Sequence, residues 1–200
     1  MNDAATEAGP DPIRGPFGNA SGTTRRRVLW IAGAAALVLW AFLVYQDEQI
    51  KDSQGPGIVP FEVAGTADEA QDILDDWGKQ GRDDARVSLY VDFAYLVAYS
   101  IFLAVGCTVA SERLGRRGMS RLARIGPLLG WAMFIAGACD AIEDVALLRV
   151  VDGHTETWPG VALYAAIPKF AIAGIGLAYV IAGAVMGRSA RREGEPAQSA

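Results

Sequence analysis

Hydrophobic residues fall into four long blocks along the chain, and polar segments separate the blocks. They cover residues 28–45, 87–110, 125–148 and 161–187. A helix needs about 20 mostly apolar residues to cross the hydrocarbon core of a bilayer, and each block approaches or exceeds that length. The pattern therefore predicts an all-α integral membrane protein, folded as a bundle of four transmembrane helices.

The composition agrees with a membrane protein and excludes several other classes. Of the 200 residues, 52% are hydrophobic and 20% are charged. Cys107 and Cys139 lie inside apolar blocks, without the spacing typical of a disulfide framework or a zinc site. The arginines cluster beside the ends of the blocks, so we interpret them as membrane anchors and not as a nucleic-acid-binding surface. No motif identifies a cofactor.

The first apolar block follows a run of arginines, Thr24-Arg25-Arg26-Arg27-Val28-Leu29. This run resembles a twin-arginine export signal. However, no small-x-small cleavage pattern follows the block, because the next residues are Gln46-Asp47-Glu48-Gln49. We therefore predict an uncleaved first span over residues 25–46. Residues 1–24 are small and polar, which predicts a disordered tail.

The distribution of arginine predicts the orientation of the spans. Basic segments at 25–27, 111–124 and 188–192 alternate with acidic connections at 46–86 and 150–160. Positively charged loops stay on the cytoplasmic side. The alternation predicts a multi-pass protein of the bacterial inner (plasma) membrane with both termini in the cytoplasm. The remaining boundaries are an extracytoplasmic acidic loop at 47–86, spans two to four within 87–187, and a cytoplasmic tail at 188–200.

One helix is predicted inside the acidic loop, over residues 67–77. Thr66 and Glu69 form a capping box, and Gly78 supplies a stop. Between them, apolar residues recur at helical spacing; they are Ala70, Ile73, Leu74 and Trp77. This amphipathic helix has two interpretations. It lies over the outer mouth of the bundle with Trp77 as a lid, or it is a solvated loop helix that covers nothing functional.

Ionisable residues inside the spans are the candidate site. Asp140, Glu143 and Asp144 share one face of the third span. The predicted orientation places them, with Asp92 of the second span and Lys169 of the fourth, roughly 6–12 Å below the outer ends of their helices. Charges at that depth normally face a bundle interior or a wet cavity. The candidate ligand-binding residues are Asp92, Tyr95, Tyr99, Asp140, Glu143, Asp144 and Lys169.

The charges in this layer do not balance, since four carboxylates face one lysine. Basic residues near the outer ends, Arg82, Arg86 or Arg149, could offset part of the excess. Otherwise one or two carboxyls carry a proton, or a cation binds. Oxygen ligands suit Mg²⁺, Ca²⁺, Na⁺ or an organic ammonium rather than zinc. In a purely structural alternative, Lys169 pairs with Asp92 or Asp140 only to fix helix register.

A recurring pattern extends over about residues 58–175. Its elements are Pro60-Phe61-Glu62-Val63-Ala64-Gly65, Trp77-Gly78, Gly81-Arg82, Asp92-Phe93, Ala138-Cys139-Asp140-Ala141-Ile142-Glu143-Asp144 and Lys169. The pattern resembles a family of small four-span bacterial membrane proteins without an established activity. The resemblance implies a shared architecture and polar site, and it adds Glu62 as a candidate ligand from the outer side. The chain departs from the pattern at Asp144, where asparagine is common in the family.

Three function classes fit these features. The first is an outer-leaflet-facing acidic pocket that binds or moves a cation, a proton or a polar lipid headgroup. The second is a scaffolding subunit with a purely structural ion-pair layer. The third is a lipid-modifying enzyme with Asp140 or Glu143 as general acid or base and Lys169 as electrostatic partner. The lipid bilayer is a partner in each class, and transport would require a homo-oligomer because four spans make a thin wall for a pore.

Overall fold

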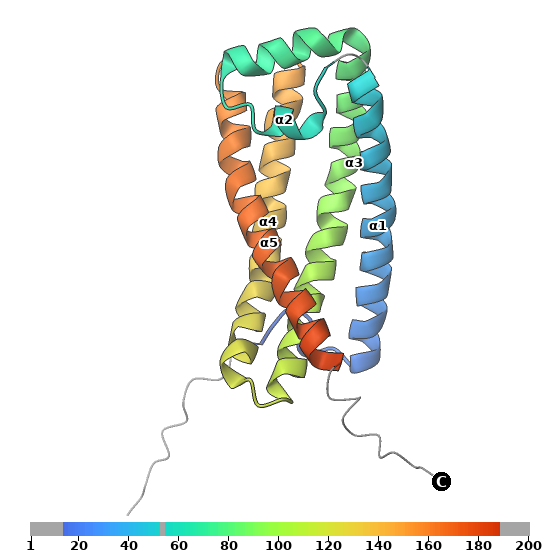
Figure 1. The fold of residues 1–200 in the computed structure, drawn as a ribbon, viewed down its shortest axis with the longest axis vertical. Helices are drawn as coiled ribbons and strands as arrows, with labels where there is room; N and C mark the ends of the chain where they lie inside the picture. The colour runs from blue at the N-terminus through green and yellow to red at the C-terminus, as the bar shows by residue number, and fades with distance from the viewer. Residues whose placement is uncertain (1–13, 53–54, 189–200) are drawn as a thin grey trace, which may run out of the picture.

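The computed structural model describes residues 14–52 and 55–188, and this part of the chain is helical throughout, apart from short connections (Figure 1). Four of its helices are long and apolar enough to cross a membrane, as the four hydrophobic blocks predicted. The chain is therefore a multi-pass membrane protein. The helices are α1 (Gly22–Asp52), α2 (Ile58–Glu62), α3 (Ala67–Gly115), α4 (Ser120–Val151) and α5 (Trp158–Arg188).

Helix α3 consists of two parts that meet at Gly78. The first part lies across the top of the bundle in Figure 1, and the second part runs down through it. Thr66 caps the start, as predicted, by accepting a hydrogen bond from the Glu69 amide at 3.3 Å. Gly78 has φ 55° and ψ −156°, a conformation that favours glycine because it lacks a Cβ. The chain thus turns at the predicted stop and resumes the helix at once, so the second long helix begins well before residue 87.

The first part of α3 packs tightly on the bundle. Leu74 and Trp77 are 0% and 1% exposed. The Trp77 ring lies 4.7 Å from the ring of Phe61 in α2, and its Nε1 donates a hydrogen bond to the Pro56 carbonyl at 2.6 Å. Leu89 of α3 and Leu147 of α4 belong to the same hydrophobic cluster. Residues 67–77 are therefore part of the folded core and not a solvated loop helix.

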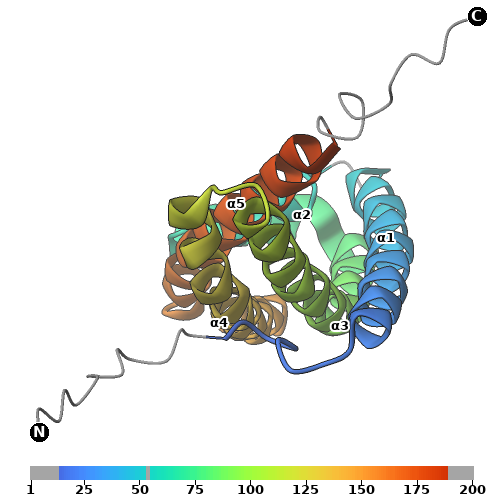
Figure 2. The ribbon, with the colours of Figure 1, turned by 90° about the horizontal axis from the view of Figure 1, so that it is seen from below.

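Helix α3 is the centre of the bundle. It packs on α1, α4 and α5, whereas α1 packs almost entirely on α3. Figure 2, seen from below, shows α3 between α1 on one side and α4 on the other. Small residues allow α3 and α4 to approach closely: a Cβ at Gly130 would lie 3.2 Å from the Ala104 carbonyl oxygen. The opposite side of α3 leaves α1 and α5 separated from each other.

The first span differs from its predicted boundaries at both ends. Residues 14–21, predicted to be disordered, lie against the bundle: Trp131 Nε1 donates to the Arg14 carbonyl at 3.0 Å, and Thr108 Oγ1 donates to the Pro16 carbonyl at 3.0 Å. Helix α1 also continues beyond residue 46 to Asp52. It does so because Ile50, one turn after Gln46, is buried in the cluster around Trp77. The rest of the predicted tails, 1–13 and 189–200, lies outside the described residues.

Candidate functional site

Lys169 of α5 lies at the centre of the polar layer. Its Nζ is 2.7 Å from Glu143 Oε2 and 3.0 Å from Asp140 Oδ1, both in α4. Glu62 Oε2, at the end of α2, is 3.8 Å away. The ammonium also lies 4.4 Å from the centre of the Phe170 ring. Of the two pairings expected for Lys169, with Asp92 or with Asp140, the ion pairs among the described residues include the one with Asp140, and Glu62 joins it from the loop side.

Local structure explains why these groups converge. Glu143 and Asp144 follow Asp140 by three and four residues, about one helical turn, and all three are almost fully buried on the inner face of α4. Glu62 is carried by α2, which is held in place by the contact of Phe61 with Trp77. Residues 67–77, the first part of α3, form a cap helix over the bundle, and this cap helix therefore positions one of the carboxylates that contact Lys169.

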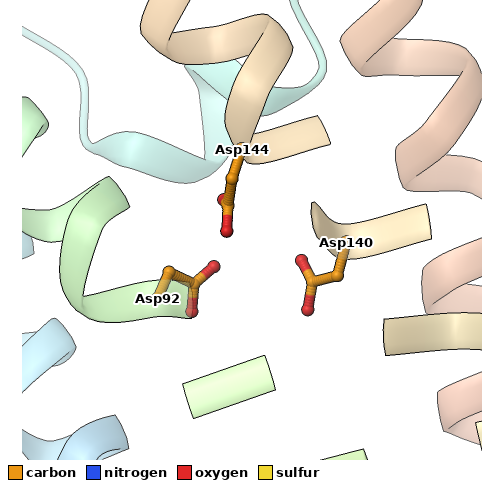
Figure 3. A group of neighbouring side chains, drawn as sticks. All are labelled: Asp92, Asp140 and Asp144. Atoms are coloured by element: carbon orange, nitrogen blue, oxygen red, sulfur yellow. The ribbon is translucent and has the colours of Figure 1, made fainter. Parts of the chain in front are cut away.

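A second group of carboxylates lies beside the lysine. One oxygen from each of Asp92, Asp140 and Asp144 lies within 4.8 Å of the others. Figure 3 shows the three carboxylates pointing toward a common space, Asp92 from α3 and the other two from α4. Asp144 Oδ2 is buried without a hydrogen-bond partner among the described residues. Buried polar atoms normally have a hydrogen-bond partner, so this oxygen is available to bind a cation or to accept a hydrogen bond.

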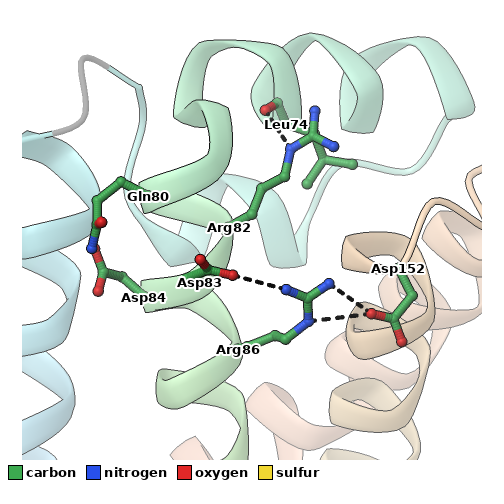
Figure 4. A network of polar contacts seen from close by, with 7 residues as sticks. All are labelled: Leu74, Gln80, Arg82, Asp83, Asp84, Arg86 and Asp152. Atoms are coloured by element: carbon green, nitrogen blue, oxygen red, sulfur yellow. Dashed lines mark hydrogen bonds and ion pairs between the residues drawn. The ribbon is translucent and has the colours of Figure 1, made fainter.

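The basic residues expected near the outer ends do not relieve the excess charge. Arg82 donates to the Leu74 carbonyl and pairs with Asp75. Arg86 pairs with Asp83 and Asp152 across the top of the bundle, as Figure 4 shows. The expectation that these arginines offset the layer is wrong, because each has partners closer to the surface.

Arg149 also points elsewhere, since its guanidinium lies 6.0 Å from the centre of the Trp158 ring. Within the described part of the chain, Lys169 is thus the one basic group with an ion pair to this layer. The carboxylates of the layer are those of Glu62, Asp92, Asp140, Glu143 and Asp144.

The two predicted tyrosines extend the site along α3. The rings of Tyr95 and Tyr99 lie 5.2 Å apart, and both line the same cavity as Asp92. The Tyr99 hydroxyl is buried without a hydrogen-bond partner in the residues that the structure describes. These two side chains therefore place aromatic surface and an available hydroxyl directly beside the acidic groups.

A groove with a volume of 1260 Å³ connects the polar layer to the middle of the bundle. Helices α1 and α5 form its walls and α3 forms its floor. Asp92, Asp140 and Lys169 line its polar end, and Glu143 and Asp144 do not line it. Its remaining length is largely apolar, with walls that include Leu29, Trp30, Leu37, Phe102, Leu177 and Val180.

Sequence reasoning missed the contribution of α1 to this groove. Trp30 and Trp40 of the first apolar block both line the groove. The available signal was the position of Asp47 at the end of the first span, which also lines the groove. Asp47 accepts a hydrogen bond from the Ile58 amide at 2.6 Å and so connects α1 to α2.

Burial raises the pKa of Glu62 to about 7, and the neighbouring Lys169 ammonium opposes the rise. The ordinary value is 4.5. A carboxyl with a raised pKa in the folded state binds its proton more tightly there than in the unfolded chain. Its contribution to stability is therefore complete below pH 4.5 and is lost as the pH rises toward 7.

We predict that Glu62→Gln reduces the loss of stability between pH 4.5 and 7. Wild type should lose up to a few kcal/mol of unfolding free energy between about pH 4.5 and 7, and the variant should lose clearly less. Urea unfolding of the detergent-solubilised protein across this range, followed by tryptophan fluorescence, measures the difference. Glu156→Gln, at an exposed position beyond α4, is the matched control. Identical pH profiles for wild type and Glu62→Gln would show that Glu62 titrates as an exposed carboxyl.

Comparison with protein-family models, with curated proteins and with solved structures finds no match for this chain.

Proposed function

We propose that this protein binds a membrane amphiphile, with the polar headgroup at the acidic end of the groove and the apolar chain along α3. The observation that carries this proposal is the lining of the groove: one continuous volume has acidic side chains and Lys169 at one end, and it is mostly apolar between that end and Arg113 at the opposite end. A ligand that matches such a lining must itself have a polar end and an apolar length.

The dimensions of the groove support a lipid-like ligand. Its volume of 1260 Å³ exceeds that of most pockets for small soluble ligands, which run to about 1,000 Å³. Its lining on α1 extends from Leu29 to Asp47, a length of about 27 Å along a helix. The hydrocarbon core of a bilayer is about 30 Å thick. The groove is thus long enough for an extended acyl or prenyl chain.

The orientation of the arginines supports placing the polar end in the extracytoplasmic leaflet of the bacterial inner membrane. The connection between α3 and α4, the start of α1 and the end of α5 lie together at the bottom of Figure 1, opposite the cap helix. These ends carry the three basic segments. Under the positive-inside rule the bottom is cytoplasmic and the cap is extracytoplasmic. Helix α2, whose Ile58, Val59 and Glu62 line the groove, would then cover the headgroup from outside, and Trp77 would act only through its contact with Phe61, since residues 67–77 do not line the groove.

A purely structural role for the ion pairs is the competing proposal. The two contacts of Lys169 with α4 favour it, because they fix α5 against α4 whether or not a ligand is present. Two features favour a ligand instead. A structural pair does not need an unpartnered carboxylate oxygen on Asp144, and it does not need a groove along α3.

We predict that Gly174→Phe abolishes amphiphile binding without unfolding the protein. Gly174 lines the groove on α5, and a Cβ at this position would meet no atom within 4 Å. The new ring can therefore occupy the groove without a backbone clash. Native mass spectrometry of protein extracted in a mild detergent should show one retained lipid-sized adduct in wild type and at least about a tenfold lower occupancy in the variant, equivalent to ~1.4 kcal/mol.

Ala171→Phe is the matched control, since Ala171 is exposed on α5 and does not line the groove. It should retain the adduct at the wild-type level. Equal adduct occupancy in wild type and Gly174→Phe would contradict binding in the groove. The absence of any adduct from wild type, together with full stability of both variants, would favour the structural role.

A further inference from the structure

We infer that Asp92, Asp140 and Asp144 bind a hard divalent cation, with its free coordination positions toward the groove. The three side chains come from α3 and α4, and their carboxylates point toward one space in Figure 3. Carboxylate oxygens are the ligands that Ca²⁺ and Mg²⁺ prefer in proteins. The assignment concerns a different part of the layer from the ion pairs of Lys169, although Asp140 belongs to both.

The spacing of the oxygens fits an ion of the size of Ca²⁺. Ca²⁺ lies ~2.3–2.6 Å from its oxygen ligands, so two ligands on opposite sides are about 5 Å apart. The three oxygens lie within 4.8 Å of one another, so all of them lie within about 2.8 Å of a common point and could bind Ca²⁺ there after side-chain shifts of less than about 0.5 Å. Mg²⁺ requires roughly 2.0–2.1 Å to each oxygen, so the side chains would have to contract around it.

Asp144 supplies an independent reason for a cation. It is 2% exposed, and its Oδ2 has no hydrogen-bond partner in the described part of the chain. The nearest basic group is engaged elsewhere, since Lys169 pairs with Glu143 and with the Oδ1 atom of Asp140. A buried charged carboxylate without a partner is strongly destabilising, and either a proton or a cation removes that penalty. The neighbouring carboxylates of Asp92 and Asp140 supply the further oxygen ligands that a cation needs and a proton does not.

The groove gives an ion at the three carboxylates a path of access and leaves some of its coordination positions free. Asp92 and Asp140 line the groove, whereas Asp144 lies behind them. An ion held from behind by Asp144 would keep positions open toward the groove, where water or an oxygen atom of a ligand can bind. Because the three carboxylates belong to the protein itself, this cation site does not depend on the proposed amphiphile.

Calorimetric titration of the full-length protein in detergent, after treatment with a chelator, tests the site with CaCl₂ and MgCl₂ as the probes. We expect one Ca²⁺ per chain, with weaker binding of Mg²⁺. Asp144→Asn should lower the Ca²⁺ affinity at least about tenfold, because the amide keeps the shape of the side chain and lacks its charge. The same variant should unfold at a higher temperature than wild type when no cation is present, since it removes an unpartnered charge.

Two further variants complete the test. Asp92→Asn, at the rim of the groove, should also weaken Ca²⁺ binding, whereas Asp76→Asn, on the exposed side of the cap helix, should not change it. Gly174→Phe should still bind Ca²⁺, so the cation site and the amphiphile proposal can fail separately. Failure of wild type to bind Ca²⁺ or Mg²⁺ in a one-to-one ratio, or unchanged Ca²⁺ affinity in Asp144→Asn, would overturn the inference.

Discussion

Lys169→Met should destabilise the bundle by roughly 3–5 kcal/mol, the range found when one partner of a buried ion pair is removed. The lysine is 7% exposed and contacts carboxylates from two other helices, α2 and α4. Methionine has a similar length but leaves Glu143 and Asp140 without their cation. Reversible unfolding in mixed micelles, followed by circular dichroism, measures the loss. Lys79→Met, at an exposed position, should change the free energy of unfolding by less than about 0.5 kcal/mol.

The double variant Lys169→Met/Glu143→Gln tests whether Glu143 is the main partner of Lys169. Glu143 lies closer to the ammonium than Asp140 does, 2.7 Å against 3.0 Å. In the Lys169→Met background, neutralising Glu143 should therefore recover more of the lost unfolding free energy than neutralising Asp140. Residues that act as a pair are not additive, and the double variant should be more stable than the sum of the two single losses implies. Additive losses within about 0.5 kcal/mol would show that Lys169 does not depend on Glu143.

Trp77→Ala should cost about 3–5 kcal/mol, as expected for a large aromatic side chain in a core. Trp77 is 1% exposed, and it holds α2 through the Phe61 ring and the Pro56 carbonyl. The loss should also release Glu62 from the neighbourhood of Lys169, because α2 carries that carboxylate. The expected readouts are a lower midpoint of unfolding and faster proteolysis between α1 and α3.

Tyr164→Ala is the matched control for the cap, since Tyr164 on α5 is 78% exposed. It should leave the midpoint of unfolding and the rate of proteolysis unchanged. A Trp77→Ala protein with the wild-type midpoint would mean that the cap helix does not stabilise the bundle.

The number of helices and the polar layer could be predicted because both leave strong local signals. Four apolar blocks of membrane length have few alternatives in a chain of this size. Carboxylates at one-turn spacing in an apolar block predict a shared buried face, and Asp140, Glu143 and Asp144 do share one. The turn at Gly78 was predicted as a stop because glycine favours both a helix end and a left-handed turn.

The groove could not be predicted, because it depends on which helices do not touch. Nothing in the first apolar block indicates that α1 packs on α3 and not on α5. The partner of Arg86 was missed for a similar reason, since Asp152 is distant in the sequence and reaches it only through the packing of α3 on α4. Residues 14–21 were predicted to be disordered from composition, and long-range contacts with Thr108 and Trp131 hold them instead.

The most direct test of the proposed function is an experimental density map of the protein in a lipid nanodisc. We expect elongated density along α3, between α1 and α5, with its compact end within hydrogen-bond distance of Lys169 or Asp92. The same density should be missing in Gly174→Phe, whose helices should otherwise superpose on those of wild type. A map in which α1 packs directly on α5 and closes the groove, or in which no density reaches the polar end, would contradict amphiphile binding in the groove.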